Sequence, residues 1–416
     1  MTGLKLAAAL VCVLYGGWEC IRRKQPLFFK LLLYAMASYL LGTLFTAGYA
    51  LVYGHEPEGF HVGILGYMGT YFFLLSSYYG AINRLADGGE ARYRGYRLTA
   101  ASGPLLVLVL LAHSVRTLGA GACLTYALLC LPIAPTLYFS IKHLILPDVD
   151  LGIIRVMPLQ CLRHRILHGA GPFTGPCMYR FGYPGGRVCP VVGASYDAAA
   201  NGRNGGAQMV YIIFLCLTIP MLLMLPLLEI RSRCIVGFML LGTVTALSAY
   251  EINTIVYPMT GLSARSFSEL VPPMTEELLK AMPVLLYAVL LDDRRNRVLP
   301  IAMAVGVGFA ILENSMILID NVGSVTVLWA TARGFSASLM HGLCTVVAGT
   351  GITYVKKQKK LFYTGTFGLL SISITMHALF NLLIQSVYDY IGMAMPLVLY
   401  GLIYWLYKGQ RVRLPF

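Results

Sequence analysis

Long apolar runs separated by short polar stretches make up most of this chain. A run of about 17–25 apolar residues is long enough to cross a bilayer as a helix. Lipid offers the backbone no hydrogen-bond partner, so such runs have to be helical. The pattern predicts an all-α polytopic membrane protein with roughly twelve transmembrane helices. The runs lie near residues 4–20, 28–53, 62–82, 99–115, 120–142, 209–228, 235–253, 270–291, 298–319, 332–354, 362–385 and 392–407.

Composition supports this pattern and narrows the function. Of the 416 residues, 57% are hydrophobic and 12% are charged, whereas about a quarter of residues are charged in a soluble domain. A soluble globular enzyme, a disordered chain and a disulfide-stapled secreted domain are excluded. The net charge of +14 comes from basic residues in short runs between apolar stretches, which is typical of cytoplasmic loops. The expected partner is the lipid bilayer, and no nucleic acid is expected.

Three regions follow from the distribution of these runs. Residues 1–145 form an N-terminal multi-span region whose role the sequence does not indicate, and residues 208–416 form a second multi-span domain. Between them, 146–207 is polar and rich in Gly, Pro and Cys. The positive-inside rule orients each half consistently, but joining the halves leaves one crossing unaccounted for. Either 146–207 contains an unusual crossing or one span is misplaced.

Polar groups inside the spans of the second half indicate a site, because ionisable groups in a membrane are costly unless they are used. With a rise of about 1.5 Å per residue, Glu276 and Glu313 each lie about 9 Å below the outer end of their span. His341 and His377 lie about 12–13 Å below it by the same arithmetic. Four separate spans thus bring unlike groups to one level near the outer face.

These residue types suit hydrolysis of an acyl bond, expected to be a peptide bond. Two histidines and one carboxylate, here His341, His377 and Glu313, suit a zinc ion with one position left open for water. A second carboxylate, Glu276, would then take the proton of that water. A route without metal is also open, in which Glu276 activates water while the histidines and Asn381 stabilise the oxyanion.

The order of these motifs resembles that of the PrsW-type intramembrane proteases, in the wider clan of the CAAX prenyl endopeptidases. The resemblance covers roughly 209–400. Glutamate at 313, where the CAAX branch has histidine, and the lack of arginine directly after Lys280 both favour the PrsW-like branch. The matching residues are Glu276-Glu277, Phe309 with Glu313-Asn314, His341, and His377 with Asn381.

The resemblance implies an intramembrane metalloprotease with a CAAX-protease-like helical core. Its substrate would be a membrane-anchored protein, such as an anti-sigma factor, cleaved near the outer face of a bacterial cell membrane. The catalytic residues that it implies are Glu276, Glu277, Glu313, His341, His377 and Asn381.

Two other functions use the same intramembrane acids and histidines. One is a proton-coupled transporter or channel, since such groups also form proton relays, although the sequence shows no inverted repeat of the kind that transporters contain. The other is a non-catalytic membrane sensor. Convergence of the four motifs in space favours the hydrolase, and their dispersal would exclude it.

Overall fold

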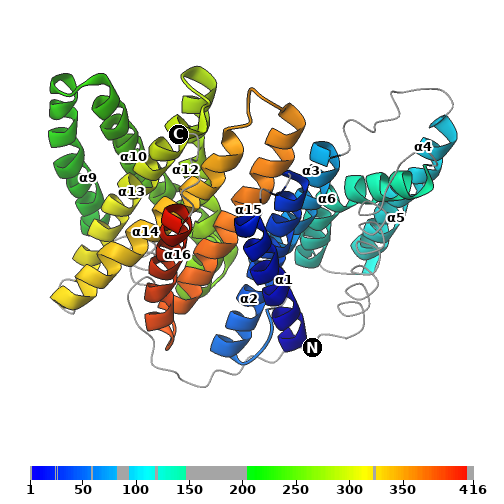
Figure 1. Cartoon of the computed structure of the whole chain (residues 1–416). Coiled ribbons are helices and arrows are strands. Elements are labelled where there is room, and N and C mark those ends of the chain that lie inside the picture. The colour runs from blue at the N-terminus through cyan, green and yellow to red at the C-terminus, as the bar shows by residue number, and fades with distance from the viewer. Residues whose placement is uncertain are drawn as a thin grey trace.

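The computed structural model describes residues 2–23, 25, 27–57, 60–81, 93–117, 120–146, 204–321 and 325–409. These residues form long helices joined by short connections and contain no strand (Figure 1), so the prediction of an all-α fold is confirmed. The helices are α1 (Thr2–Arg22), α2 (Leu27–Tyr53), α3 (Gly63–Ala81), α4 (Arg94–Ala100), α5 (Ser102–Thr117), α6 (Ala120–Ile145), α9 (Asn204–Met224), α10 (Ile230–Thr260), α11 (Ala264–Leu270), α12 (Pro272–Leu290), α13 (Arg295–Asp320), α14 (Val327–Ile352), α15 (Lys359–Ile384) and α16 (Asp389–Gly409), with the 3-10 turn η2 (Leu225–Leu227) after α9.

The helices coincide with the runs predicted from the sequence. Within the described residues, nine helical stretches are long and apolar enough to cross a membrane. α3, α12 and α16 also coincide with predicted spans but are not among these nine, and α12 carries Glu276, Glu277 and Lys280. Nearly all of the polar segment 146–207 lies outside the described residues, so its topology and the division into three regions stay predictions.

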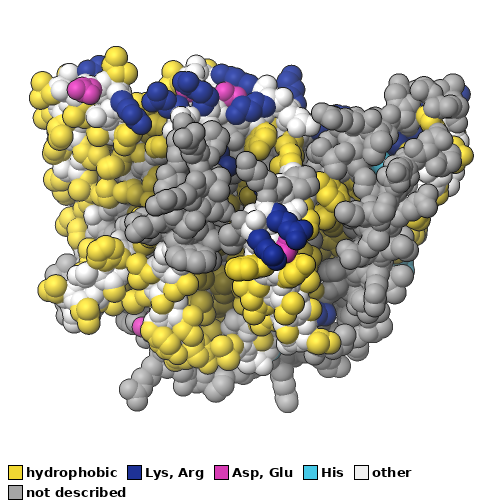
Figure 2. Space-filling view, viewed as in Figure 1, with side chains coloured by type: hydrophobic (Ala, Val, Ile, Leu, Met, Phe, Trp, Pro, Cys, Tyr) yellow, Lys and Arg dark blue, Asp and Glu magenta, His cyan; other side chains and the backbone are white. Residues whose placement is uncertain are grey.

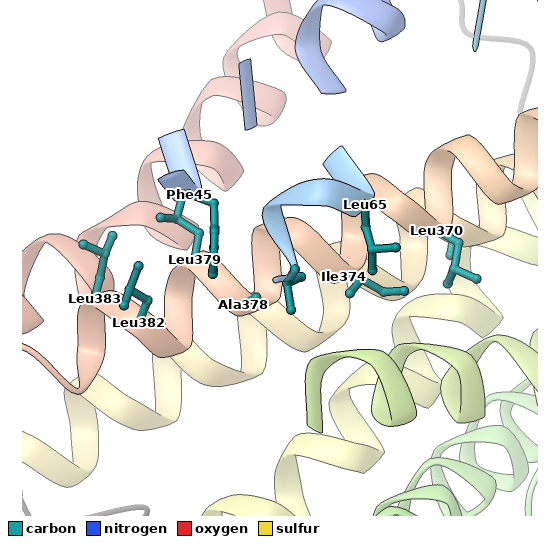
Figure 3. Close-up of a cluster of buried hydrophobic side chains, with 10 residues drawn as sticks. Phe45, Leu65, Leu370, Ile374, Ala378, Leu379, Leu382 and Leu383 are labelled. Atoms are coloured by element: carbon teal, nitrogen blue, oxygen red, sulfur yellow. The ribbon is translucent and has the colours of Figure 1, made fainter. Parts of the chain in front are cut away.

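Helix α15 lies at the centre of the bundle, with α14 and α16 on one side and α2 and α3 on another (Figure 1). Every residue from Ser371 to Phe380 is buried, because helices surround this stretch on all sides. Side chains from α2 and α3, including Phe45 and Leu65, pack in one hydrophobic cluster with Ile374 and Leu379 of α15 (Figure 3). N-terminal helices thus complete the packing around the helix that carries His377.

Positive side chains gather along one end of the bundle (Figure 2). Figure 1 places the α9–α10, α12–α13 and α14–α15 turns at that end. The basic residues at or beside these turns are Arg231, Arg233, Arg294, Arg295, Arg297, Lys356, Lys357, Lys359 and Lys360. The sides of the bundle below them are largely apolar. By the positive-inside rule this end faces the cytoplasm. The other end, where α12 begins, then faces outward.

Glycines let α10 and α13 approach until their backbones touch. A Cβ atom on Gly308 would overlap the carbonyl oxygen of Met239, and one on Gly242 would overlap that of Val305. Small residues of this kind allow the close contacts that hold membrane helices together.

We expect Gly308→Ala to destabilise the protein, because the new methyl group would push α10 away from α13. Overpacking of this kind costs about 1–3 kcal/mol. Thermal unfolding in detergent micelles measures the loss. Gly237→Ala is the matched control, since a Cβ there meets nothing within 4 Å. Equal unfolding temperatures for the two variants would contradict the prediction.

Candidate active site

The first turns of α12 hold three ionisable residues inside the bundle. Pro272 and Pro273 occupy the first positions of the helix, where the missing N–H groups have no helical acceptor to lose. Glu276, Glu277 and Lys280 follow within two turns and are all buried. Because Glu277 and Lys280 lie three residues apart, they share one helix face. The ammonium of Lys280 donates a hydrogen bond of 2.6 Å to Oε1 of Glu277.

His377 of α15 also contacts the carboxylate of Glu277. Its Nδ1 lies 2.9 Å from Oε1 of Glu277, and its Nε2 lies 3.7 Å from Oε2 of Glu276. A carboxylate paired with an ammonium accepts hydrogen bonds, so Nδ1 of His377 carries the proton. The lone pair of Nε2 then points toward Glu276, whose Oε2 is buried without a hydrogen-bond partner.

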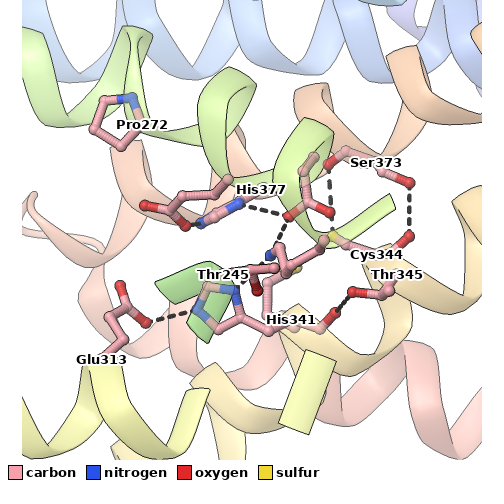
Figure 4. A network of polar contacts seen from close by, with 12 residues as sticks. Thr245, Pro272, Glu313, His341, Cys344, Thr345, Ser373 and His377 are labelled. Atoms are coloured by element: carbon pink, nitrogen blue, oxygen red, sulfur yellow. Dashed lines mark hydrogen bonds and ion pairs between the residues drawn. The ribbon is translucent and has the colours of Figure 1, made fainter. Parts of the chain in front are cut away.

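His341 of α14 links this group to α13. Its Nδ1 lies 2.9 Å from Nζ of Lys280, and its Nε2 lies 2.7 Å from Oε2 of Glu313 (Figure 4). An ammonium can only donate, so Nδ1 accepts and Nε2 carries the proton that is bonded to Glu313. The two imidazole rings meet edge to face with centroids 4.9 Å apart.

The structure therefore brings together five of the six site residues predicted from the sequence. Among the described residues, ligand atoms of Glu276, His341 and His377 all lie within 4.8 Å of one another, and these residues could hold a metal ion. The set predicted from the sequence had Glu313 in place of Glu276; Glu313 is bonded to His341 instead. The sixth residue, Asn381, points elsewhere: its amide donates to the carbonyl oxygen of Ser268 at 3.2 Å.

The short helix α11 directly precedes α12 and lies at the outer end of the bundle. Its residue Ser268 donates to Oε1 of Gln385, just after α15, at 2.9 Å. Its residue Glu269 accepts the hydroxyl of Tyr53, the last residue of α2, at 2.8 and 2.9 Å. Arg265 pairs with the same carboxylate at 3.1 Å. Hydrogen bonds thus connect α11 to α2 in the N-terminal half and to the end of α15, the helix that carries His377.

The stability of this contact should depend on pH. Burial raises the pKa of Glu269 to about 7, against the hydrogen bonds and charge of Tyr53 and Arg265, which lower it. The folded protein then holds a proton that the unfolded chain releases near pH 4.5, so stability falls as the pH rises through about 7. We expect the unfolding temperature in nanodiscs to drop between pH 5 and pH 8, and Glu269→Gln to remove part of that drop. An unchanged pH profile in the variant would contradict this assignment.

Two buried charged residues of this region were not singled out by the sequence analysis. Arg333 of α14 lies 3.9 Å from Glu313, and Glu269 lies in α11. Both stand at the ends of apolar runs, where a charged residue normally reaches water. The sequence gives one signal for a buried charge here, which is that Arg333 falls just inside the predicted span 332–354.

The fold and the cluster together define a class: a polytopic helical membrane protein with acids and imidazoles gathered inside its bundle near the outer end. A comparison with known families makes this specific, since residues 231–407 match the family model described as PrsW family intramembrane metalloprotease. The matched stretch is less than half of the chain and contains all six predicted site residues. No curated protein and no solved structure matches the chain significantly.

The predicted resemblance and the prediction of a membrane-embedded peptidase are thereby confirmed. The chain is a multi-pass integral membrane protein. The four motifs converge rather than disperse, and the family match favours the hydrolase over the transporter and sensor alternatives.

Proposed function

We propose that this protein hydrolyses a peptide bond of a membrane-anchored protein near the outer face of the membrane, with water activated by a glutamate beside a zinc ion. The observation that supports this most is the contact of Glu276, Glu313, His341 and His377, which come from four different helices. An anti-sigma factor is the substrate class that the family resemblance implies.

The residues present fit a metal ion. Two imidazoles and one carboxylate are the donor set of many catalytic zinc sites, and Oε2 of Glu276 is a buried acceptor without a hydrogen-bond partner. His377 is held from behind by Glu277, as metal-bound histidines usually are. We therefore favour Glu276, His341 and His377 as ligands, and His341 would give up the Nε2 proton that it shares with Glu313 when the metal binds. When bound, zinc would polarise the peptide carbonyl and lower the pKa of a water molecule.

Glu313 is then the remaining carboxylate and is suited to the role of general base. Its side chain is 22% exposed, whereas those of Glu276, His341 and His377 are at most 8% exposed. Water reaches the cluster most easily at Glu313, which can take its proton and pass it to the leaving amine. Lys280 and Glu277 keep the two histidines in place from the inner side of the cluster.

Purified protein in proteoliposomes tests this function. The probe is a panel of single-span test proteins with varied outer juxtamembrane sequences, and mass spectrometry locates each cut. We expect cuts near the outer face that stop with a zinc chelator and return with added Zn²⁺. Cleavage that persists without bound metal would instead support the metal-free route. If no panel member is cut, the proposed function fails.

A further inference from the structure

Arg333 of α14 is a buried charged residue that has no role in the chemistry proposed above. It precedes His341 on α14 by eight residues, which is about 12 Å along the helix toward the outer end. Its side chain is only 6% exposed. The guanidinium lies over the ring of Trp329, 5.8 Å from its centroid. It thus lies on the outer side of the cluster, inside the bundle.

The guanidinium has unused hydrogen-bonding capacity. Its ion pair with Glu313 measures 3.9 Å, well beyond the roughly 2.8 Å of a charge-assisted hydrogen bond. Nε of Arg333 is buried without a hydrogen-bond partner. One turn further along α14, the buried hydroxyl of Ser336 also lacks a partner. Buried donors normally find acceptors, so this turn is suited to receive oxygen atoms from a ligand.

The place of Arg333 relative to Glu313 indicates which ligand this is. Glu313 is the most exposed acid of the cluster, so a substrate arriving from the outer side meets both residues together. A peptide chain presents a carbonyl oxygen at every residue, and a guanidinium offers five N–H donors in one plane. The predicted oxyanion donor, Asn381, is bonded to the backbone of α11 instead.

We propose that Arg333 is a catalytic residue that binds the carbonyl oxygen of the scissile peptide bond and stabilises its negative charge. The water oxygen adds to the carbonyl carbon and a water proton passes to Glu313, so the electron pair of the C=O double bond moves onto the oxygen that faces Arg333. The C–N bond then breaks, the carbonyl re-forms and the amine leaves with the proton from Glu313. This inference rests on the proposed function.

Arg333→Gln and Arg333→Lys test the inference in the proteoliposome assay. Loss of one oxyanion donor lowers kcat about 100–1,000-fold, and we expect this for the glutamine variant with KM and zinc content close to wild type. The lysine variant should keep part of the rate, because an ammonium is a charged donor without the planar fork. Arg294→Gln is the matched control, since Arg294 is exposed and pairs with Asp292 at the cytoplasmic end.

The readouts separate this role from a structural one. A phosphinic peptide that mimics the tetrahedral intermediate should lose affinity for Arg333→Gln by about the same factor as kcat/KM, whereas a purely structural defect would weaken substrate and mimic alike. Wild-type kcat in either folded Arg333 variant, with Glu276→Gln inactive, would overturn the inference and leave the proposed function standing. If Arg333→Gln does not fold, the lysine variant decides. If wild type cuts no panel member, both fail.

Discussion

Replacing either Glu276 or Glu313 with glutamine is expected to lower the cleavage rate by about 100-fold or more, but only the first replacement is expected to release the metal. Glutamine keeps the size of each side chain and removes its charge. General-base catalysis contributes about 10²–10⁴-fold to a rate, so Glu313→Gln should lose that much while keeping zinc. Glu276→Gln should lose zinc as well, because the carboxylate of Glu276 lies within 4.8 Å of a ring nitrogen of both His341 and His377. Peptide cleavage and metal analysis of the same preparations measure both effects.

The two variants also distinguish this ligand set from the one predicted from the sequence. If Glu313 is the third ligand and Glu276 the base, the metal contents of the variants will be reversed. His377→Ala serves as the reference for a lost ligand in either scheme. Gln358→Ala is the control for effects of expression and purification, because Gln358 lies at the start of α15, at the cytoplasmic end and away from the site. Full activity in both glutamate variants would exclude the hydrolase mechanism.

Much of the fold followed from the apolar runs alone, because a bilayer leaves the backbone few choices. The level of the site also followed, since counting residues from the outer ends placed Glu276 and Glu313 at one depth. The hydrogen-bond partner of each site residue did not follow from the sequence. A helix position gives the depth of a side chain but not which neighbouring helix it faces, so the bond between Glu313 and His341 was not foreseen.

Asn381 shows the same limit. Its spacing from His377 predicts a shared helix face, but that face is wide enough for His377 to meet α12 while Asn381 meets α11. Likewise, Lys280 stands four residues after Glu276, a spacing that predicts a shared helix face. It bonds Glu277 three residues earlier and reaches His341 as well. Local spacing allowed both partners, and only the packing of α14 against α12 selects between them.

Replacing Lys280 with methionine is expected to destabilise the protein strongly as well as inactivate it. Lys280 is fully buried, bonds Glu277 and His341, and lies 4.5 Å from the ring centroid of Phe309. Methionine fills similar space but leaves the carboxylate of Glu277 without a counter-charge. Removing one partner of a buried ion pair costs about 3–5 kcal/mol. Thermal and denaturant-induced unfolding in nanodiscs measure the loss.

A second substitution separates the charge from the packing. In Lys280→Met combined with Glu277→Gln, neither partner is charged, so most of the lost stability should return. Activity should not return, because the carboxylate that orients His377 is missing in the double variant. The coupling energy from the two single variants and the double variant isolates the pair itself. A coupling near zero would show that Glu277 and Lys280 do not form the buried ion pair on which the alignment of His377 depends.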